Sequence, residues 1–101
     1  MDHLMLRRQL RRGDSVGRYG GEEFIALLPG TTISDAAMLM DRLRADFATI
    51  RHDTDQGPFS ATFSCGIASV VEAADIKTAI SAADGALYEA KRSGRNRVVT
   101  V

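Results

Sequence analysis

The chain has 101 residues, enough for one small domain but too few for two. Thirteen basic residues balance thirteen acidic ones, so the net charge of zero gives no general attraction to nucleic acid or to an anionic membrane. The hydrophobic share of 45% argues against disorder, and the single cysteine excludes an internal disulfide. We therefore expect one folded domain over residues 1–101 in a reducing, cytoplasmic compartment, where any phosphate-binding site is local.

Local sequence patterns also argue against a membrane or secreted protein and against a thiol-dependent enzyme. No apolar run approaches the roughly 20 residues of a membrane span, and residues 1–10 lack the apolar core of a signal peptide. Cys65 lies in ATFSCGIAS, a setting that is typical of a buried thiol in a strand rather than of a catalytic one. We expect no membrane segment and no thiol catalysis.

The N-terminal third predicts the end of a helix followed by a hairpin. Leucines among arginines over residues 4–12 indicate the last turns of an amphipathic helix, which the following Gly-Asp pair stops. Residues 15–19 and 23–29 are short strand candidates. Gly20 and Gly21 between them suit a turn that needs positive φ.

A long amphipathic helix is predicted next, over residues 35–50. Ser34 directly precedes it and is a good N-cap. The helix has an apolar stripe at helical spacing, which indicates packing on a sheet. The stripe consists of Ala37, Met40, Leu43, Phe47 and Ile50.

The middle of the chain predicts a connector and then a strand. Residues 51–58 are polar, and we expect a connector there in which His52 is solvated rather than a metal ligand. Apolar residues alternate with small or polar ones over residues 59–71, which predicts a strand.

The last third predicts a capped helix and a terminal strand. Asp75 can cap a helix over residues 76–93, and Gly94 then takes the usual position after its end. Gly85 inside this helix suggests close packing or a slight bend. Residues 97–101 are a strand candidate, so the order of elements predicts helices packed on a mostly antiparallel sheet, an α+β domain.

The RYGGEEF stretch carries the first candidate chemistry. Adjacent Glu22 and Glu23 would point to opposite sides of a strand, so one carboxylate can face a ligand. Gly20 and Gly21 let a bulky anion approach the backbone, and Mg²⁺ would offset the repulsion between carboxylate and phosphate. A solvated acidic hairpin is the alternative interpretation of the same residues.

A second cluster lies at the end of the last helix. Lys91 and Arg95 flank Gly94, and a lysine point charge with an arginine fork is a common means of holding polyphosphate oxygens. Basic residues at a helix C-terminus also satisfy the helix dipole, which is the alternative here.

These motifs together resemble the GGDEF family of diguanylate cyclases. RYGGEEF is followed by LLPGTT, then FSCGIAS, then ADGALYEAKRSGRN, in the family's order and spacing from about Leu4 to Val101. The resemblance implies a ferredoxin-like, nucleotidyl-cyclase-type fold with an antiparallel-rich sheet. It also implies condensation of two GTP molecules into cyclic di-GMP, in a head-to-head homodimer with Mg²⁺ or Mn²⁺, and a parent protein with an N-terminal sensory or regulatory domain.

The resemblance also implies a role for each matching residue. Glu22 falls at the family's metal-binding and proposed proton-accepting position, and Glu23 at the neighbouring carboxylate. The two glycines before them form the backbone that approaches the nucleotide. Lys91 and Arg95 fall at positions that hold the β and γ phosphates.

A third match lies upstream of the signature. RRGD, residues 11–14, stands at the offset of the family's RxxD inhibitory site, so Arg11 and Asp14 would bind product cyclic di-GMP. Arg42 matches the family's secondary arginine for this site. A charged helix end and turn is the alternative interpretation.

The chain departs from the family in one respect. The family's first strand and helix carry a metal-binding aspartate and an asparagine and a second aspartate that read guanine, and none of these is present in this sequence. We expect a partial GGDEF domain that lacks the family's first strand and has no cyclase activity as a separate chain. A non-catalytic module that binds cyclic di-GMP is the main alternative, and a structural dimerisation remnant is a third.

Overall fold

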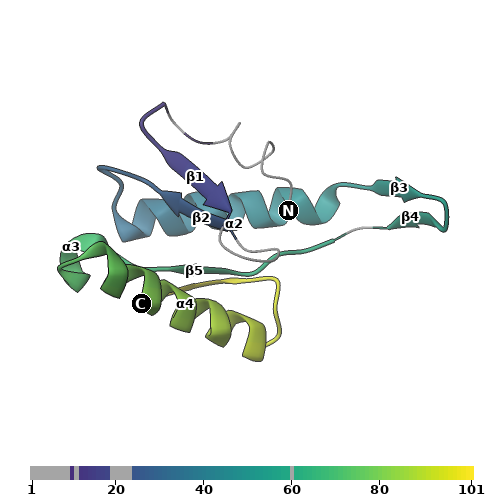
Figure 1. Cartoon of the computed structure of the whole chain (residues 1–101). Coiled ribbons are helices and arrows are strands. Elements are labelled where there is room, and N and C mark those ends of the chain that lie inside the picture. Colours follow the sequence, from purple (N-terminus) through teal and green to yellow (C-terminus); the bar gives the residue numbers. More distant parts are fainter. Residues whose placement is uncertain (1–9, 11, 19–23, 60) are drawn as a thin grey trace. The chain divides into compact units, whose positions relative to one another are not determined.

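The computed structural model describes residues 10, 12–18, 24–59 and 61–101. Contacts divide the chain into two compact units, residues 1–31 and residues 32–101 (Figure 1). In the described part of the chain, no helix is both long enough and apolar enough to cross a bilayer. The helix end predicted over residues 4–12 falls almost entirely outside the described residues.

The first unit contains a β-hairpin. Strand β1, Ser15–Arg18, pairs antiparallel with β2, Phe24–Leu27, and the register runs from Ser15 opposite Leu27 to Arg18 opposite Phe24. This pairing confirms the predicted hairpin. It also makes residues 19–23, which lie outside the described residues, the connection between the two strands.

Helix α2, Ile33–Thr49, opens the second unit. Thr32, rather than the predicted Ser34, is its N-cap: its side chain accepts a hydrogen bond of 3.1 Å from the backbone N–H of Asp35. The buried face consists of Ala36, Met40, Leu43 and Phe47. Ala36 replaces the predicted Ala37 because spacings of four, three and four residues follow the helical period more closely from position 36.

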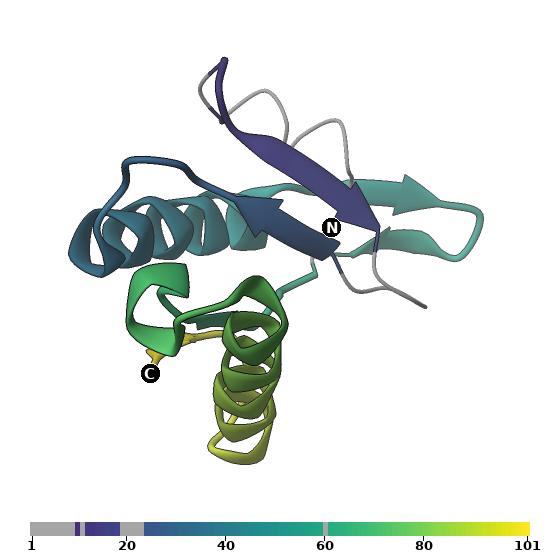
Figure 2. The same cartoon turned by 60° about the vertical axis from the view of Figure 1, so that its left-hand side comes forward.

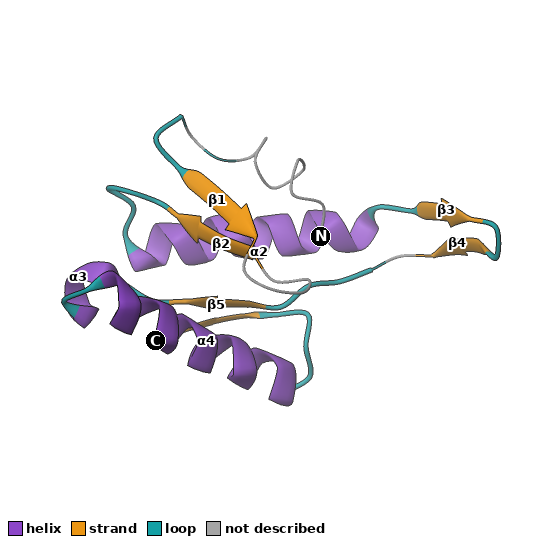
Figure 3. Cartoon of the chain, in the orientation of Figure 1, coloured by secondary structure: helices purple, strands orange, loops and turns teal. Residues whose placement is uncertain are grey.

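A second hairpin follows α2, where the sequence predicted a polar connector. Strand β3, His52–Thr54, pairs antiparallel with β4, Gly57–Phe59 (Figure 3). Thr54 is opposite Gly57, so Asp55 and Gln56 form the turn, and Gly57 has a φ of +104°. The connector prediction is therefore wrong for these residues: backbone pairing forms the hairpin without an apolar period in the sequence.

A parallel pair of strands lies at the centre of the second unit. Strand β5, Cys65–Ile67, pairs with β6, Val98–Thr100. Among the described residues of the single strand predicted over residues 59–71, only Phe59, which ends β4, and Cys65–Ile67 are in strands, whereas the terminal strand is confirmed. This sheet is parallel and not antiparallel as predicted, because a helix crosses over between its two strands.

Two helices make up that crossover. The short α3, Val70–Ala73, is capped by Ser69, and α4, Ile76–Arg92, is capped by Asp75 as predicted. Asp75 Oδ1 accepts a hydrogen bond of 2.7 Å from the backbone N–H of Thr78. The structure therefore confirms the start and the type of the last helix.

The β5–β6 sheet lies between the two long helices (Figures 1 and 2). Its contact with α4 is very close, since a Cβ on Gly66 would collide with the Ala83 carbonyl oxygen. On the α2 side, the rings of Phe47 and Phe63 pack at 5.7 Å between centroids. Outside the neighbouring backbone of its own helix, no atom lies within 4 Å of a Cβ position at Gly85, so close packing, one of its two predicted explanations, is wrong.

Candidate functional site

The C-terminal end of α4 is a tightly closed turn. The backbone N–H of Arg95 donates to the carbonyl oxygen of Ala90 at 2.9 Å, the six-to-one bond of a Schellman motif. Gly94 lies between them with a φ of +127°, which a residue with a side chain adopts only with strain. Ser93 Oγ also donates to the Glu89 carbonyl oxygen at 2.7 Å. The predicted stop at Gly94 is confirmed, and the turn fixes where the chain leaves the helix.

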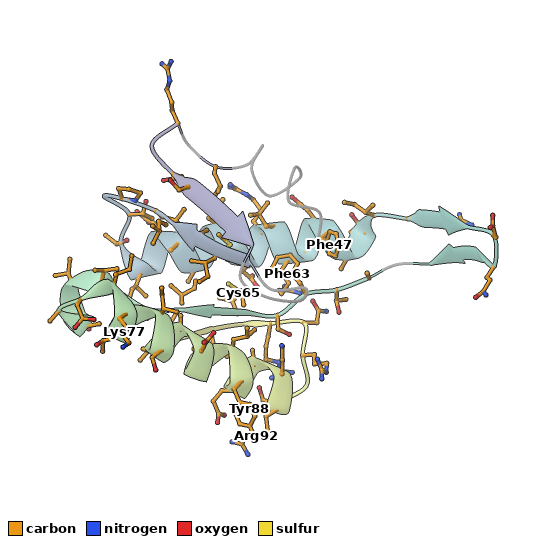
Figure 4. The ribbon with its side chains drawn as sticks, in the orientation of Figure 1. Phe47, Phe63, Cys65, Lys77, Tyr88 and Arg92 are labelled. Carbon is orange, nitrogen blue, oxygen red and sulfur yellow. The ribbon has the colours of Figure 1, made fainter. Side chains whose placement is uncertain are left out.

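The basic residues at this end differ in their partners. Arg92 donates to both carboxylate oxygens of Glu89, at 3.0 and 3.1 Å, and this hydrogen bond and the charge of Glu89 raise the pKa of Arg92 (Figure 4 labels Arg92). Arg95 is exposed, and no hydrogen bond or ion pair within the described residues engages its guanidinium. Lys91, in the last turn, is also exposed. The structure thus brings Lys91 and Arg95 to one helix end, and the Arg95 fork is available to an anion.

The backbone that follows Gly94 is unusual. Arg95 has a φ of +63° and Asn96 a φ of +48°, so two consecutive residues with side chains adopt the left-handed region. Such residues persist where their surroundings fix them. The Asn96 N–H donates to Ser64 Oγ at 3.1 Å, and Arg44 Nη1 donates to Asn96 Oδ1 at 2.9 Å.

These anchors were not predicted from the sequence. Arg44 lies on α2 and is itself held by Asp41, whose Oδ1 accepts from Arg44 Nε at 2.8 Å. Ser64 precedes β5. The one local signal is the asparagine after the helix-ending Gly-Arg pair, since asparagine tolerates left-handed backbone better than most residues.

Cys65 supports the same region structurally. Its backbone N–H donates to the Arg97 carbonyl oxygen at 2.9 Å, which continues the pairing of β5 with the segment before β6. Burial raises the pKa of the Cys65 thiol to about 11. The thiol is therefore protonated at neutral pH, which agrees with a structural role rather than a catalytic one.

The other predicted site residues are distributed over both units. Arg11 and the signature residues Gly20, Gly21, Glu22 and Glu23 lie outside the described residues. Asp14, immediately before β1, is buried with 7% of its surface exposed. Arg42 is exposed on α2. Lys91, Arg95 and Arg42 therefore belong to the second unit, and Asp14 belongs to the first.

The predicted metal ligand, Glu22, lies outside the described residues. Among the described residues, no group of three histidine, cysteine, aspartate or glutamate side chains has metal-binding geometry. Glu22 and Glu23 would supply carboxylate oxygens, and Mg²⁺ in nucleotide sites takes one or two carboxylates together with phosphate oxygens. The donor type thus fits a hard divalent cation.

Comparison with known proteins decides the family. The family described as "Diguanylate cyclase, GGDEF domain" matches residues 3–97. The chain belongs to the GGDEF family. Diguanylate cyclase DgcP of Pseudomonas aeruginosa is 41% identical over 93 residues, which are 92% of this chain and 14% of that protein.

Solved structures of GGDEF domains share the fold. The active GGEEF domain of a diguanylate cyclase from Vibrio cholerae has a TM-score of 0.82 at 31% identity, covering 96% of this chain and 62% of that one. The GGDEF domain of DgcB from Caulobacter crescentus, solved in complex with c-di-GMP, has a TM-score of 0.77 at 26% identity, covering 96% and 58%. This chain therefore spans less than two thirds of each of these relatives.

Proposed function

We propose that this GGDEF chain supplies the signature hairpin and the phosphate-binding end of a diguanylate cyclase, which condenses two GTP molecules into cyclic di-GMP. The observation that carries the proposal is the pairing of family membership over residues 3–97 with an exposed, uncommitted Arg95 at the end of α4. Lys91 in the last helical turn adds a second cation at the same end.

The reaction asks the protein for alignment and charge neutralisation. The 3′-hydroxyl oxygen of one GTP attacks the α-phosphorus of the other, a phosphorus–oxygen bond forms, the bond to the β-phosphate breaks, and pyrophosphate leaves. Two such steps close the ring. Lys91 and Arg95 would hold the β and γ phosphates, which become the leaving group, so their charge stabilises the negative charge that develops there. A head-to-head homodimer would bring the two substrates together.

The signature carboxylates complete the proposed chemistry. Glu22 would hold Mg²⁺ or Mn²⁺, which when bound would offset the charge of the phosphates. Glu22 also stands at the family's proton-accepting position, and Glu23 is its neighbouring carboxylate. Gly20 and Gly21 would let the nucleotide approach the backbone.

We also propose product inhibition. Arg11, Asp14 and Arg42 would bind cyclic di-GMP, with Arg42 exposed on α2 as such a contact requires. Further proposals follow the family: a ferredoxin-like sheet in the whole domain, a cytoplasmic site where GTP is available, and a sensory or regulatory domain on the N-terminal side in the parent protein.

A restored domain tests the cyclase proposal. We expect the 101-residue chain to make no cyclic di-GMP from GTP, because this sequence has neither the family's metal-binding aspartate nor its guanine-reading residues. Joining it to the preceding segment of the Vibrio cholerae GGEEF domain should give product that chromatography detects. Glu22→Gln should abolish turnover in that protein, while Glu72→Gln, the same change at an exposed position on α3, should not.

Two outcomes would contradict this proposal. Product formation that survives Glu22→Gln would remove Glu22 from the chemistry. A folded, dimeric, restored domain without any turnover would remove the cyclase assignment.

A non-catalytic module that binds cyclic di-GMP is the second candidate function. The structure of the Caulobacter domain in complex with c-di-GMP, at 26% identity, favours it for the residues that do not depend on the metal site. This candidate predicts that the isolated chain binds cyclic di-GMP more tightly than GTP. Calorimetry on the wild type and on Arg11→Ala tests it, because loss of a charge-assisted hydrogen bond should weaken binding of cyclic di-GMP by about tenfold or more.

A further inference from the structure

The turn that presents Arg95 is held in place by side chains from outside it. Arg95 and Asn96 both have positive φ, at +63° and +48°. An unrestrained turn would escape this strain by rotating to ordinary backbone angles, which would re-aim the Arg95 side chain. Something must therefore keep the turn as it is.

Two hydrogen bonds anchor Asn96, the residue next to Arg95. Ser64 Oγ accepts from the Asn96 backbone N–H at 3.1 Å, which ties the turn to the chain just before β5. Arg44 Nη1 donates to Asn96 Oδ1 at 2.9 Å, which ties it to α2. Both bonds span more than thirty residues of sequence, so they are tertiary contacts and not features of a local turn.

The charge of Arg44 is already committed within α2. Its Nε donates to Asp41 Oδ1 at 2.8 Å, and only 20% of its side chain is exposed. Arg44 is therefore suited to hold Asn96 and poorly suited to bind a phosphate itself. Arg95 is the opposite case: its guanidinium is exposed and meets no hydrogen-bond acceptor in the described part of the chain.

We infer that Asn96, which is hydrogen-bonded to Arg44 and Ser64, is a positioning residue. It holds the Arg95 guanidinium where it can bind the β and γ phosphates of GTP. This inference rests on the proposed function, because it deepens the role of the same phosphate cluster. Asn96 acts through Arg95. It therefore affects how much more tightly the chain binds nucleotides that have those phosphates than nucleotides that lack them.

Three substitutions at position 96 separate the hydrogen bond from the backbone strain. Asn96→Gly keeps the freedom to adopt positive φ and removes the acceptor for Arg44. Asn96→Asp keeps an oxygen acceptor and tolerates the left-handed region. Asn96→Ala removes the acceptor and adds strain, so it reports on both. Arg95→Ala provides the reference for complete loss of the guanidinium.

The experiment is a titration of the 101-residue chain with GTP and, separately, with GMP. Binding is monitored by NMR from the chemical shifts of the amides of residues 94–96. GMP lacks the β and γ phosphates, so the ratio of the two dissociation constants isolates their contribution. We expect Arg95→Ala to weaken GTP binding by about tenfold or more with GMP unchanged. Asn96→Gly should give most of that loss, and Asn96→Asp should restore wild-type affinity.

A double substitution distinguishes positioning from general stability. If Asn96 acts through Arg95, Asn96→Gly should cause no further loss of GTP affinity when Arg95→Ala is already present. Equal weakening of GTP and GMP by Asn96→Gly, or an undiminished effect in the Arg95→Ala background, would overturn the inference. So would the absence of any GTP-dependent shift at residues 94–96 in the folded wild type.

The phosphate-binding role of Arg95 and the positioning role of Asn96 can be tested separately. If Arg95→Ala lowers GTP affinity but Asn96→Gly does not, the phosphate assignment stands and the positioning role of Asn96 is overturned. If Arg95→Ala leaves the ratio of GTP to GMP affinity unchanged, the phosphate assignment itself is overturned, and the inference with it.

Discussion

The two long helices of the second unit, α2 and α4, have the same length and contact the same parallel pair of strands. They differ in the size of the side chains that they bury. Helix α2 buries large side chains, Met40, Leu43 and Phe47. Helix α4 buries only alanines, at positions 79, 86 and 90. The strands thus contact large side chains of α2 on one face and approach the backbone of α4 on the other.

This difference indicates a division of roles. Large side chains remove much apolar surface from water, so α2 contributes more hydrophobic free energy. Small residues let backbones approach, and the close contact of Gly66 with Ala83 and Leu87 leaves α4 little freedom to shift. The helix that carries Lys91, and ends just before the turn with Arg95, therefore packs against β5 through backbone contact. α2 takes part in the site through the Arg44 hydrogen bond to Asn96.

Removing a large side chain from α2 should give the largest loss of stability. Leu43 has 1% of its surface exposed. We expect Leu43→Ala to lower the free energy of unfolding by about 3.5 kcal/mol, because a cavity adds to the lost transfer free energy. Urea denaturation measures this. Met38→Ala, on the same helix with 69% of Met38 exposed, should change it by less than about 0.5 kcal/mol. Similar losses from the two variants would contradict the assigned buried face.

Adding a methyl group at the contact with α4 should destabilise almost as much. A Cβ at Gly66 would collide with backbone atoms of Ala83 and Leu87 and lie 2.9 Å from the Ala86 carbonyl carbon. Backbone atoms of a helix do not yield as a flexible side chain does. We expect Gly66→Ala to cost about 3 kcal/mol of unfolding free energy in the same urea experiment.

Gly85 provides the matched control for this substitution. It lies inside α4, and nothing outside the neighbouring backbone of that helix is within 4 Å of its Cβ position. The same change, Gly85→Ala, should therefore stabilise the chain by about 0.7 kcal/mol, since alanine favours the helix and restricts the unfolded state. A loss of stability for Gly66→Ala no larger than the change for Gly85→Ala would show that α4 does not approach β5 as described.

Local signals in the sequence predicted much of this unit. A capping carboxylate at Asp75 before an amphipathic run, and Gly94 after it, define α4 correctly because both act on neighbouring backbone. Ser34 failed as the α2 cap because Thr32, two residues earlier, offers the same kind of acceptor. The β3–β4 hairpin and the parallel pairing of β5 with β6 depend on which backbone segments meet, which no periodicity encodes.

The residues of the candidate site also fall into those that local sequence predicts and those that depend on tertiary contacts. Lys91 and Arg95 were predictable because one helix end places them together. The contact between Arg44 and Asn96 was not, since its hydrogen bond joins residues 52 positions apart and no spacing in the sequence marks such a pair. The assignments of Glu22, Glu23 and Arg11 come from the family pattern, and they stay predictions because these residues lie outside the described part of the chain.

Helices α2 and α4 also differ in their N-terminal caps. The charge of one cap should have a small effect on the stability of the chain, the smallest that we predict. α4 starts at a charged cap, Asp75, and α2 at a neutral one, Thr32. Hydrogen bonds from the Thr78 backbone and then its side chain lower the pKa of Asp75. A lowered pKa stabilises the fold at pH values above the ordinary aspartate pKa of about 4, and this contribution is lost as pH falls through the folded value.

Asp75→Asn isolates that charge, because asparagine caps helices well and keeps an oxygen acceptor. We expect the melting temperature of wild type to exceed that of Asp75→Asn by a small, constant amount at neutral pH, and the difference to shrink below about pH 4. Thr32→Ser, a swap of neutral caps, should give a difference that does not vary over this range. The charge of Asp75 would have no part in starting α4 under either of two outcomes. The difference in melting temperature between wild type and Asp75→Asn could stay constant down to about pH 2, or it could vary with pH in the same way as the difference between wild type and Thr32→Ser.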